Sequence, residues 1–279
     1  MAPSKKYSIA VLSDLNKSSS ATIKSTVALA KMIGGDIAVF HVKKPSDVIN
    51  RDNQLSAMRT INDEHTKVDR QMKNLTMSIS EEFGIDIDYS FTFGHVKNEI
   101  SVYIEKNRPD IIVLGKPKSN SFKVLGDSIT EFVLNKHSGV VMITSDKAGP
   151  VPNQKIAFGT YNNSEPDMNF EFAKDIMEHA QTPLKSFKII KNSESTKYDP
   201  KSKNKRTIEY VFEHNDGAIK NLSKYLSKNN INILSVDRTE KGANELQNQM
   251  TPDIAAIIKK LDVTLLVSGK QEYKTTNHQ

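Results

Sequence analysis

The sequence predicts an α/β fold in which two tandem, open, mostly parallel five-stranded sheets carry helices on both faces, in a Rossmann-like arrangement. Three observations predict it. The chain has 279 residues, enough for two domains of medium size. Short apolar runs alternate with helical stretches, which favours right-handed β-α-β units and a parallel sheet. An internal similarity relates one half of the chain to the other.

The internal similarity also predicts the domain boundaries. Ile87–Phe91 recurs as Ile208–Phe212, and each copy is followed by a helical stretch and then an apolar strand. Residues 147–154, between the copies, have the Gly and Pro content of a linker. We therefore expect one domain at residues 1–146 and a second at residues 155–279.

In the first domain, five short apolar runs are typical of strands in a covered sheet. The expected strands are Tyr7–Leu12, Asp36–Val42, Ile85–Phe93, Asp110–Leu114 and Val140–Thr144. Between them, apolar residues recur at i, i+4 and i+7 from Ile23 and from Val68, which is the period of a helix with one buried face. The second of these patterns predicts a long helix over Leu55–Glu82.

The second domain repeats this order of elements with one omission. Its expected strands are Lys155–Phe158, Leu184–Ile190, Thr207–Phe212, Asn232–Val236 and Val263–Val267. Only Lys191–Arg206 separates the second strand from the third, which is too short for a helix of the length predicted in the first domain. We therefore expect the second domain to lack helix 2. The Lys-rich composition of this segment is typical of a surface loop, and a nucleic-acid-binding arm is the weaker alternative because Tyr198 is its sole aromatic residue.

Composition excludes several classes of site. The formal charge of +6 is too small for a dedicated nucleic-acid-binding protein, so nucleic acid is not an expected partner. Without cysteine there are no disulfides, thiolate metal sites or cysteine nucleophiles. No two of the seven histidines are three or four residues apart, so no metal site is expected. No signal peptide and no apolar run of roughly 20 residues is present, which favours a cytoplasmic protein without membrane contact.

Residues at the ends of the predicted strands indicate a nucleotide site. In an open parallel sheet, ligands bind beyond the carboxyl ends of the strands, where the strand order changes direction. A carboxylate there can accept hydrogen bonds from ribose, a glycine lets backbone amides approach a phosphate, and a serine at a helix start stands where the helix dipole favours anions. The candidate residues are Asp14, Val42, Gly115, Gly126, Ser128 and Ile129. In the alternative interpretation, Gly115 is a tight turn and Ser128 a plain helix cap.

These features together resemble the universal stress protein family. The resemblance rests on an Asp after the first strand, a long second helix, and a loop from Gly115 to Gly126 that leads into the helix beginning Ser-Ile-Thr-Glu-Phe. It covers the chain as two copies, and it is stronger in the first. It implies an adenine nucleotide alpha hydrolase-like fold and a stress-response or regulatory binding protein, with ATP or AMP bound by Asp14, the backbone around Val42 and the phosphate loop. It also implies that Val140–Thr144 pairs with Val263–Val267 inside the chain, and it leaves open whether the chain pairs again as a homodimer.

The loop departs from the pattern G-x2-G-x9-G-[S/T] found in nucleotide-binding members. Lys118 stands where the second glycine belongs, the loop is two residues short, and Asp127 precedes Ser128. A side chain at position 118 obstructs a close backbone approach to the phosphates, and Asp127 adds repulsion. Three lysines act in the opposite direction by supplying positive charge, namely Lys116, Lys118 and Lys123.

The second domain is less suited to a nucleotide. By sequence alignment, the counterparts of Asp14, Gly115 and Ser128 are Tyr161, Asp237 and Asp253, and only Gly242 remains in its loop. A site for a cation, or no site, is the expectation there. Two other functions stay open for the whole chain, a weak ATP-hydrolysing enzyme and a pure protein-interaction module. Only Asp14 and Asp127 are placed to serve as a base or a metal-binding acid, so a binding protein is favoured over a catalyst.

Overall fold

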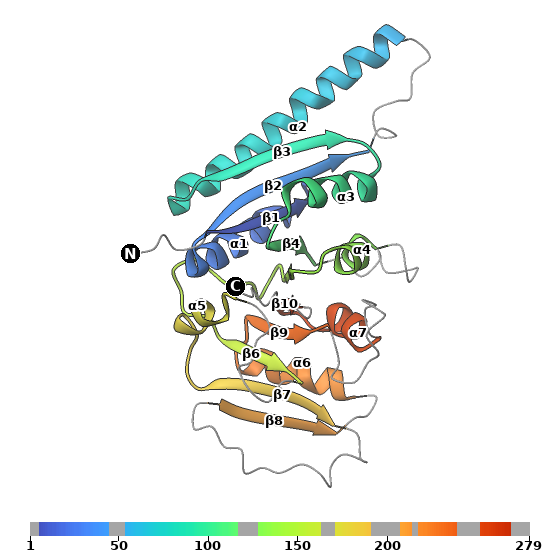
Figure 1. Cartoon of the computed structure of the whole chain (residues 1–279). Helices are drawn as coiled ribbons and strands as arrows, with labels where there is room; N and C mark the ends of the chain where they lie inside the picture. The colour runs from blue at the N-terminus through green and yellow to red at the C-terminus, as the bar shows by residue number, and fades with distance from the viewer. Residues whose placement is uncertain are drawn as a thin grey trace, which may run out of the picture.

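The fold was analysed in a computed structural model of the chain (Figure 1). The structure describes residues 6–44, 54–116, 128–162, 171–190, 207–213, 217–238 and 252–268. Residues 6–146 are called the first half and residues 155–268 the second half.

Helices and strands alternate along the first half and, apart from the step from β7 to β8, along the described residues of the second half, as the apolar pattern predicts. The first half contains β1 (Tyr7–Ser13), α1 (Ser19–Ile33), β2 (Gly35–Lys43), α2 (Gln54–Phe83), β3 (Ile87–Phe93), α3 (Val96–Asn107), β4 (Ile111–Gly115), α4 (Ile129–Lys136) and β5 (Val140–Thr144). The second contains β6 (Phe158–Tyr161), α5 (Ala173–Glu178), β7 (Leu184–Ile190), β8 (Thr207–Glu213), α6 (Ala218–Lys228), β9 (Ile233–Asp237), α7 (Pro252–Lys260) and β10 (Thr264–Ser268). The predicted α/β class is confirmed. Within the described residues, no helix is long and apolar enough to span a membrane.

The strands form one continuous sheet in the order β3-β2-β1-β4-β5-β10-β9-β6-β7-β8. Neighbouring strands run parallel within each half, and β5 and β10 pair antiparallel, with Met142 opposite Leu266. This pairing joins the two predicted five-stranded sheets at a central seam, and it confirms the expected contact between the last strands. The strand order is the same on both sides when read outward from the seam.

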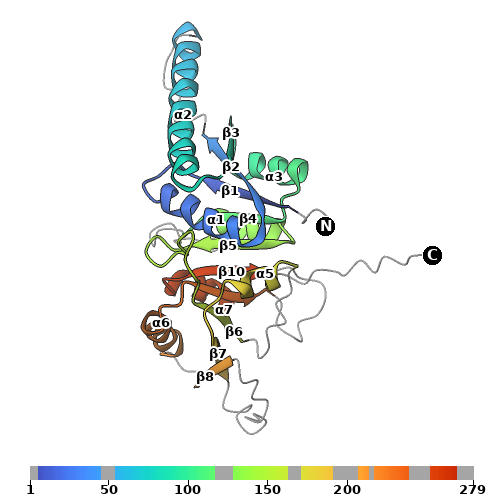
Figure 2. The same cartoon turned by 90° about the vertical axis from the view of Figure 1, so that its left-hand side faces the viewer.

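Helices cover both faces of the sheet, which explains why its central strands are apolar at successive positions. On β4, Ile112 and Leu114 face the layer formed by α3, α4, α6 and α7, whereas Ile111 and Val113 face the layer of α1, α2 and α5. Each apolar cluster contains residues of both halves, so the core continues across the seam. Figure 2 shows α2 extending well beyond the strands that it covers.

The register of β6 corrects one sequence alignment. Phe158 pairs with Ile233 as Ile9 pairs with Ile111, so the alignment of β6 with β1 is shifted by two residues from the predicted one. Tyr161 is consequently the counterpart of Leu12, not of Asp14, and both side chains are buried in the same apolar cluster. The sequence pattern missed this because a slip of two residues leaves every side chain on its original face.

A one-residue correction applies to α7. The buried residues of α7 have the same spacing as those of α4: Ile254, Ile257 and Ile258 correspond to Thr130, Val133 and Leu134. The same correspondence makes Pro252 the counterpart of Ser128. The expected equivalence of Asp253 and Ser128 is therefore wrong, because the buried face of the helix fixes its alignment.

Some predictions lie outside the described residues. The missing helix between β7 and β8 depends on residues 191–206. The predictions for Lys118, Lys123, Gly126 and Asp127 fall in residues 117–127, and Gly242 belongs to residues 239–251. The domain boundaries at residues 146 and 155 stay a prediction.

Candidate functional site

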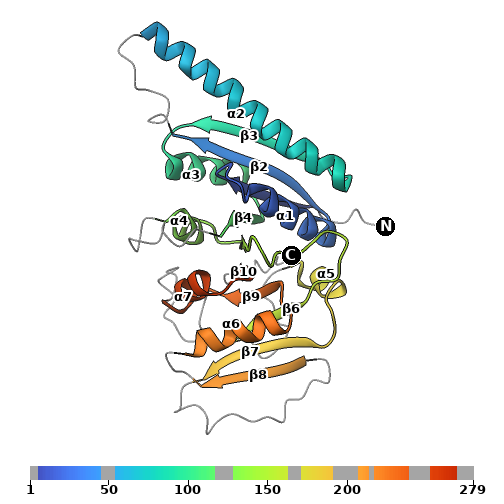
Figure 3. The same cartoon turned by 180° about the vertical axis from the view of Figure 1, so that it is seen from behind.

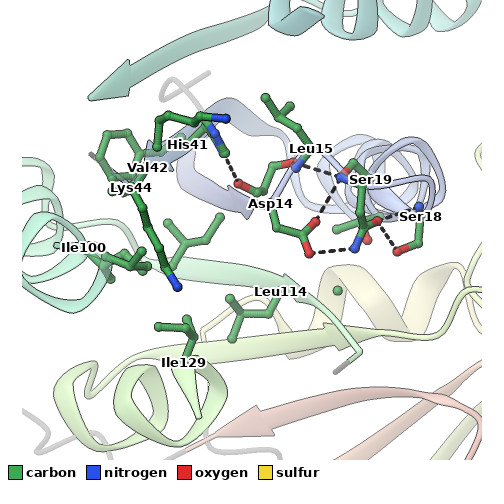
Figure 4. A pocket seen from close by; sticks show the side chains of 18 of the residues that line it. Asp14, Leu15, Ser18, Ser19, His41, Val42, Lys44, Ile100, Leu114 and Ile129 are labelled. Carbon is green, nitrogen blue, oxygen red and sulfur yellow. Dashed lines mark hydrogen bonds between the residues drawn. The ribbon is translucent and has the colours of Figure 1, made fainter. Parts of the chain in front are cut away.

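A cavity of about 760 Å³ lies at the carboxyl ends of β1, β2 and β4 in the first half (Figure 4). The strand order changes direction here, because the chain continues from β1 to β2 and later returns to the other side of β1 as β4. The structure brings five of the six predicted site residues together in its wall, namely Asp14, Val42, Gly115, Ser128 and Ile129. Gly126 is not among the described residues.

Asp14 is held in place by the turn between β1 and α1. Its Oδ2 accepts a hydrogen bond of 2.6 Å from the Asn16 side-chain amide, and its Oδ1 accepts bonds from the Asn16 backbone (3.2 Å) and Ser19 Oγ (3.4 Å). Leu15 has a φ of 55°, in the left-handed region that leucine rarely adopts, and its N–H donates to Ser13 Oγ at 3.1 Å. The strained turn thus fixes the carboxylate beside the first turn of α1 (Figure 4).

The opposite wall of the cavity is apolar. Val42 stands at the end of β2, and its neighbour Phe40 stacks on Tyr103 with ring centroids 4.2 Å apart. Further apolar side chains come from α3, β4 and α4, namely Val96, Ile100, Leu114 and Ile129. Such a surface suits the flat face of an aromatic ring system.

Gly115 and the start of α4 form the end of the cavity best suited to an anion. Ser128 caps α4, and its Oγ accepts a hydrogen bond of 3.0 Å from the Glu131 N–H. The first backbone N–H groups of a helix have no partner within that helix and point toward its positive end. A Cβ at position 115 would lie 3.1 Å from Thr22 Oγ1, so glycine keeps the backbone close to α1 there.

Charged side chains from α2 and from the end of β2 also line the cavity. Glu64 Oε1 lies 3.2 Å from Lys67 Nζ, and its Oε2 lies 3.4 Å from Lys43 Nζ. The hydrogen bond from Lys67, reinforced by Lys43, holds the pKa of Glu64 below its usual range. Lys44 extends into the cavity from the end of β2 (Figure 4). Glu64 and Lys67 have no role in the sequence prediction, since a helix pattern does not show which strand end the helix passes.

His41 also lines the cavity, on the α2 side of β2. Its Nδ1 lies 2.8 Å from the Ser13 carbonyl oxygen, so the hydrogen is on Nδ1 in the neutral ring. Burial lowers the pKa of His41, and the bond to Ser13 opposes that change. The ring is therefore neutral at pH 7 and connects the ends of β1 and β2.

Comparison with known proteins identifies the family. Residues 8–144, which include β1 to β5, match the sequence model of the universal stress protein family. The chain belongs to the universal stress protein family. The structure matches a universal stress protein from Archaeoglobus fulgidus over 95% of this chain and 97% of the other, with a TM-score of 0.66 and 15% identity. A functionally unknown protein from Pseudomonas aeruginosa matches over 96% and 94%, with a TM-score of 0.59 and 11% identity. These two structures show a shared fold, and no curated sequence matches the chain.

Lys116 is one point at which residues 8–144 contact the second half. The sequence predicts that this lysine supplies positive charge to a phosphate. Lys116 lines the cavity, but its Nζ donates to the Leu261 carbonyl oxygen at 2.7 Å, beyond the C-terminus of α7. Lys116 thus belongs to the cavity wall while its ammonium is hydrogen-bonded to the second half.

In the second half, Asp237 is indeed the counterpart of Gly115, since Asp237 pairs with Ser268 as Gly115 pairs with Thr144. Ser268 Oγ donates to Asp237 Oδ1 at 2.6 Å. An aspartate of the second half therefore stands where the first half has a glycine. Among the described residues of this universal stress protein, no three His, Asp or Glu side chains are grouped as metal ligands.

Proposed function

We propose that this universal stress protein binds an adenine mononucleotide, ATP or AMP, in the cavity of its first half and acts as a regulatory binding protein. The observation that carries the proposal is the composition of the cavity. It combines an apolar wall at Val42, a fixed carboxylate at Asp14 and the N-terminus of α4 at Ser128.

Each part of a nucleotide has a matching surface. The base would lie against the apolar wall, with the backbone around Val42 available to its polar edge. The ribose hydroxyls would donate to Asp14, whose carboxylate oxygens offer about four acceptor positions in all and receive three hydrogen bonds from the turn. The phosphates would occupy the end formed by Gly115, Ser128 and Ile129.

Charge supports the same orientation of the ligand. Lys44 and Lys116 lie along the cavity wall, and the N-terminal dipole of α4 adds positive potential. Glu64 is paired with Lys43 and Lys67, which leaves Asp14 as the acid without a cationic partner among the described residues that line the cavity.

Calorimetric titration of wild type and Asp14→Ala with ATP and AMP tests the proposal. We expect Asp14→Ala to weaken binding by about 1 to 3 kcal/mol, because a hydrogen bond to a charged acceptor is lost. Asp36→Ala is the matched control, since Asp36 is an exposed acid that pairs with Lys6 at the opposite end of β2. Equal affinities of wild type and Asp14→Ala would contradict the role of Asp14.

The same samples separate the two rival functions. A protein-interaction module without a nucleotide site would show no heat of binding with either nucleotide, and that result would refute the proposal. An ATP-hydrolysing enzyme would release phosphate from bound ATP with repeated turnover. We expect binding without turnover.

A further inference from the structure

Lys116 connects the proposed nucleotide site to the second half. It follows Gly115 directly, lines the cavity and donates to the Leu261 carbonyl oxygen at 2.7 Å. That carbonyl lies at the C-terminal end of α7, where the helix dipole attracts a cation. Asp262 Oδ1 is 4.0 Å from the same ammonium, and it accepts a hydrogen bond of 2.7 Å from Ser145 Oγ.

Arg238 has the corresponding position in the second half and is bound more firmly. The backbone N–H of Arg238 donates to the Ser268 carbonyl oxygen, and the backbone N–H of Lys116 donates to the Thr144 carbonyl oxygen. The two residues therefore follow equivalent strands. The Arg238 guanidinium donates to the carbonyls of Leu134 (2.6 Å), His137 (2.5 Å) and Gly139, at the C-terminal end of α4. Each half therefore places a cation on the last turn of the other half's helix; α4 and α7 lie on opposite sides of the seam (Figure 3).

Lys116 is the weaker of these two links. It makes one hydrogen bond across the seam where Arg238 makes three, and its second partner, the Asp262 side chain, is 51% exposed. Burial lowers the pKa of Lys116, because the lost hydration of the ammonium is only partly replaced by nearby carboxylates. An additional anion beside this ammonium would be favourable.

We propose that Lys116 is a phosphate-binding residue whose cation is contested between the ligand in the cavity and the C-terminal end of α7, so that the second half sets the affinity of the first for phosphorylated nucleotides. The inference rests on the proposed nucleotide site. A phosphate is a charged acceptor and binds an ammonium more strongly than the neutral Leu261 carbonyl does. The flexible four-carbon stem of lysine lets the ammonium turn from one acceptor to the other.

Two substitutions separate the competing partners of Lys116. Asp262→Asn removes the charge that retains the ammonium and keeps an oxygen for Ser145 Oγ. We expect it to raise ATP affinity about threefold, the size of a partly exposed ion pair. Lys116→Met keeps the apolar stem, and it should lower ATP affinity about fivefold or more because a charge-assisted bond is lost. Adenosine, which has no phosphate, should bind all variants equally.

The test is calorimetric titration of ATP and adenosine into wild type, both single variants and the double variant, with thermal unfolding to verify that each is folded. Asp36→Asn, the same change of charge at the far end of β2, is the control for general electrostatics. In the Lys116→Met background, Asp262→Asn should no longer change ATP affinity. An equal change for adenosine, or an effect of Asp262→Asn that persists without Lys116, would overturn the inference and leave the nucleotide site standing. If wild type binds no ATP, the proposed function fails, and this inference fails with it.

Discussion

The two halves of this protein arrange equivalent strands on either side of the seam but use the carboxyl ends of those strands differently. In the first half, Gly115 lies in the wall of an open cavity. In the second half its counterpart Asp237 accepts a hydrogen bond from Ser268 Oγ. The next residue, Arg238, donates hydrogen bonds to carbonyl groups at the C-terminal end of α4. The scaffold supplies an equivalent edge in both halves. The side chains after β4 and β9 therefore decide whether that edge is available to a ligand or is used as an internal contact.

The largest expected difference between the halves concerns the two cations at the seam. Arg238→Met should lower the free energy of unfolding by about 4 kcal/mol, because it leaves three partly buried carbonyl groups without their charged donor. Lys116→Met removes one hydrogen bond and a weak, partly exposed ion pair, and it should cost about 1 kcal/mol. Urea unfolding measures both values, with Arg59→Met on the exposed surface of α2 as a control for the loss of charge. Equal losses at positions 116 and 238 would show that the links are equivalent after all.

A second difference concerns the pH dependence of stability. His137, at the end of α4, is 7% exposed, and within the described structure its Nε2 has no hydrogen-bond partner. Burial, followed by the charge of Arg238, lowers the pKa of His137 from 6.5 to about 4. The corresponding residue after α7 is Leu261, which does not titrate.

The lowered pKa determines the direction in which stability changes with pH. Between pH 6.5 and about 4 the unfolded chain binds a proton at His137 that the folded protein excludes, so this contribution to stability is present above pH 6.5 and is lost as pH falls. Its full size is about 3 kcal/mol. Urea unfolding at a series of pH values should show that the free energy of unfolding falls less below pH 6.5 in His137→Leu than in wild type. The variant carries at this position the residue type that the second half has. An unchanged pH profile would contradict the assignment.

Particular residues show what the sequence could and could not predict. Most strand positions, and the gathering of five candidate residues around one cavity, were predictable, because apolar runs determine the strands and parallel strands end at a common edge. The alignment of Tyr161 with Asp14 failed because a two-residue slip preserves the alternation of side chains. Arg238 and Leu134 are 104 residues apart, and their contact depends on the antiparallel pairing of β5 and β10. No local pattern encodes such a contact.

The smallest of these three expected differences between the halves is tested by giving the first half the residue of the second at the cavity. Gly115→Asp places a carboxylate beside the proposed phosphate position, and we expect ATP affinity to fall about tenfold through charge repulsion. Gly115→Asn is the matched control, because a Cβ in either variant lies 3.1 Å from Thr22 Oγ1 and causes the same crowding. Titration at low and high salt then separates the two causes. If only Gly115→Asp loses ATP affinity, and the loss becomes smaller at high salt, charge repulsion is the cause, since exposed charges are screened by salt. Equal losses for Asp and Asn would instead show that the difference between the halves at this position is the space that glycine leaves.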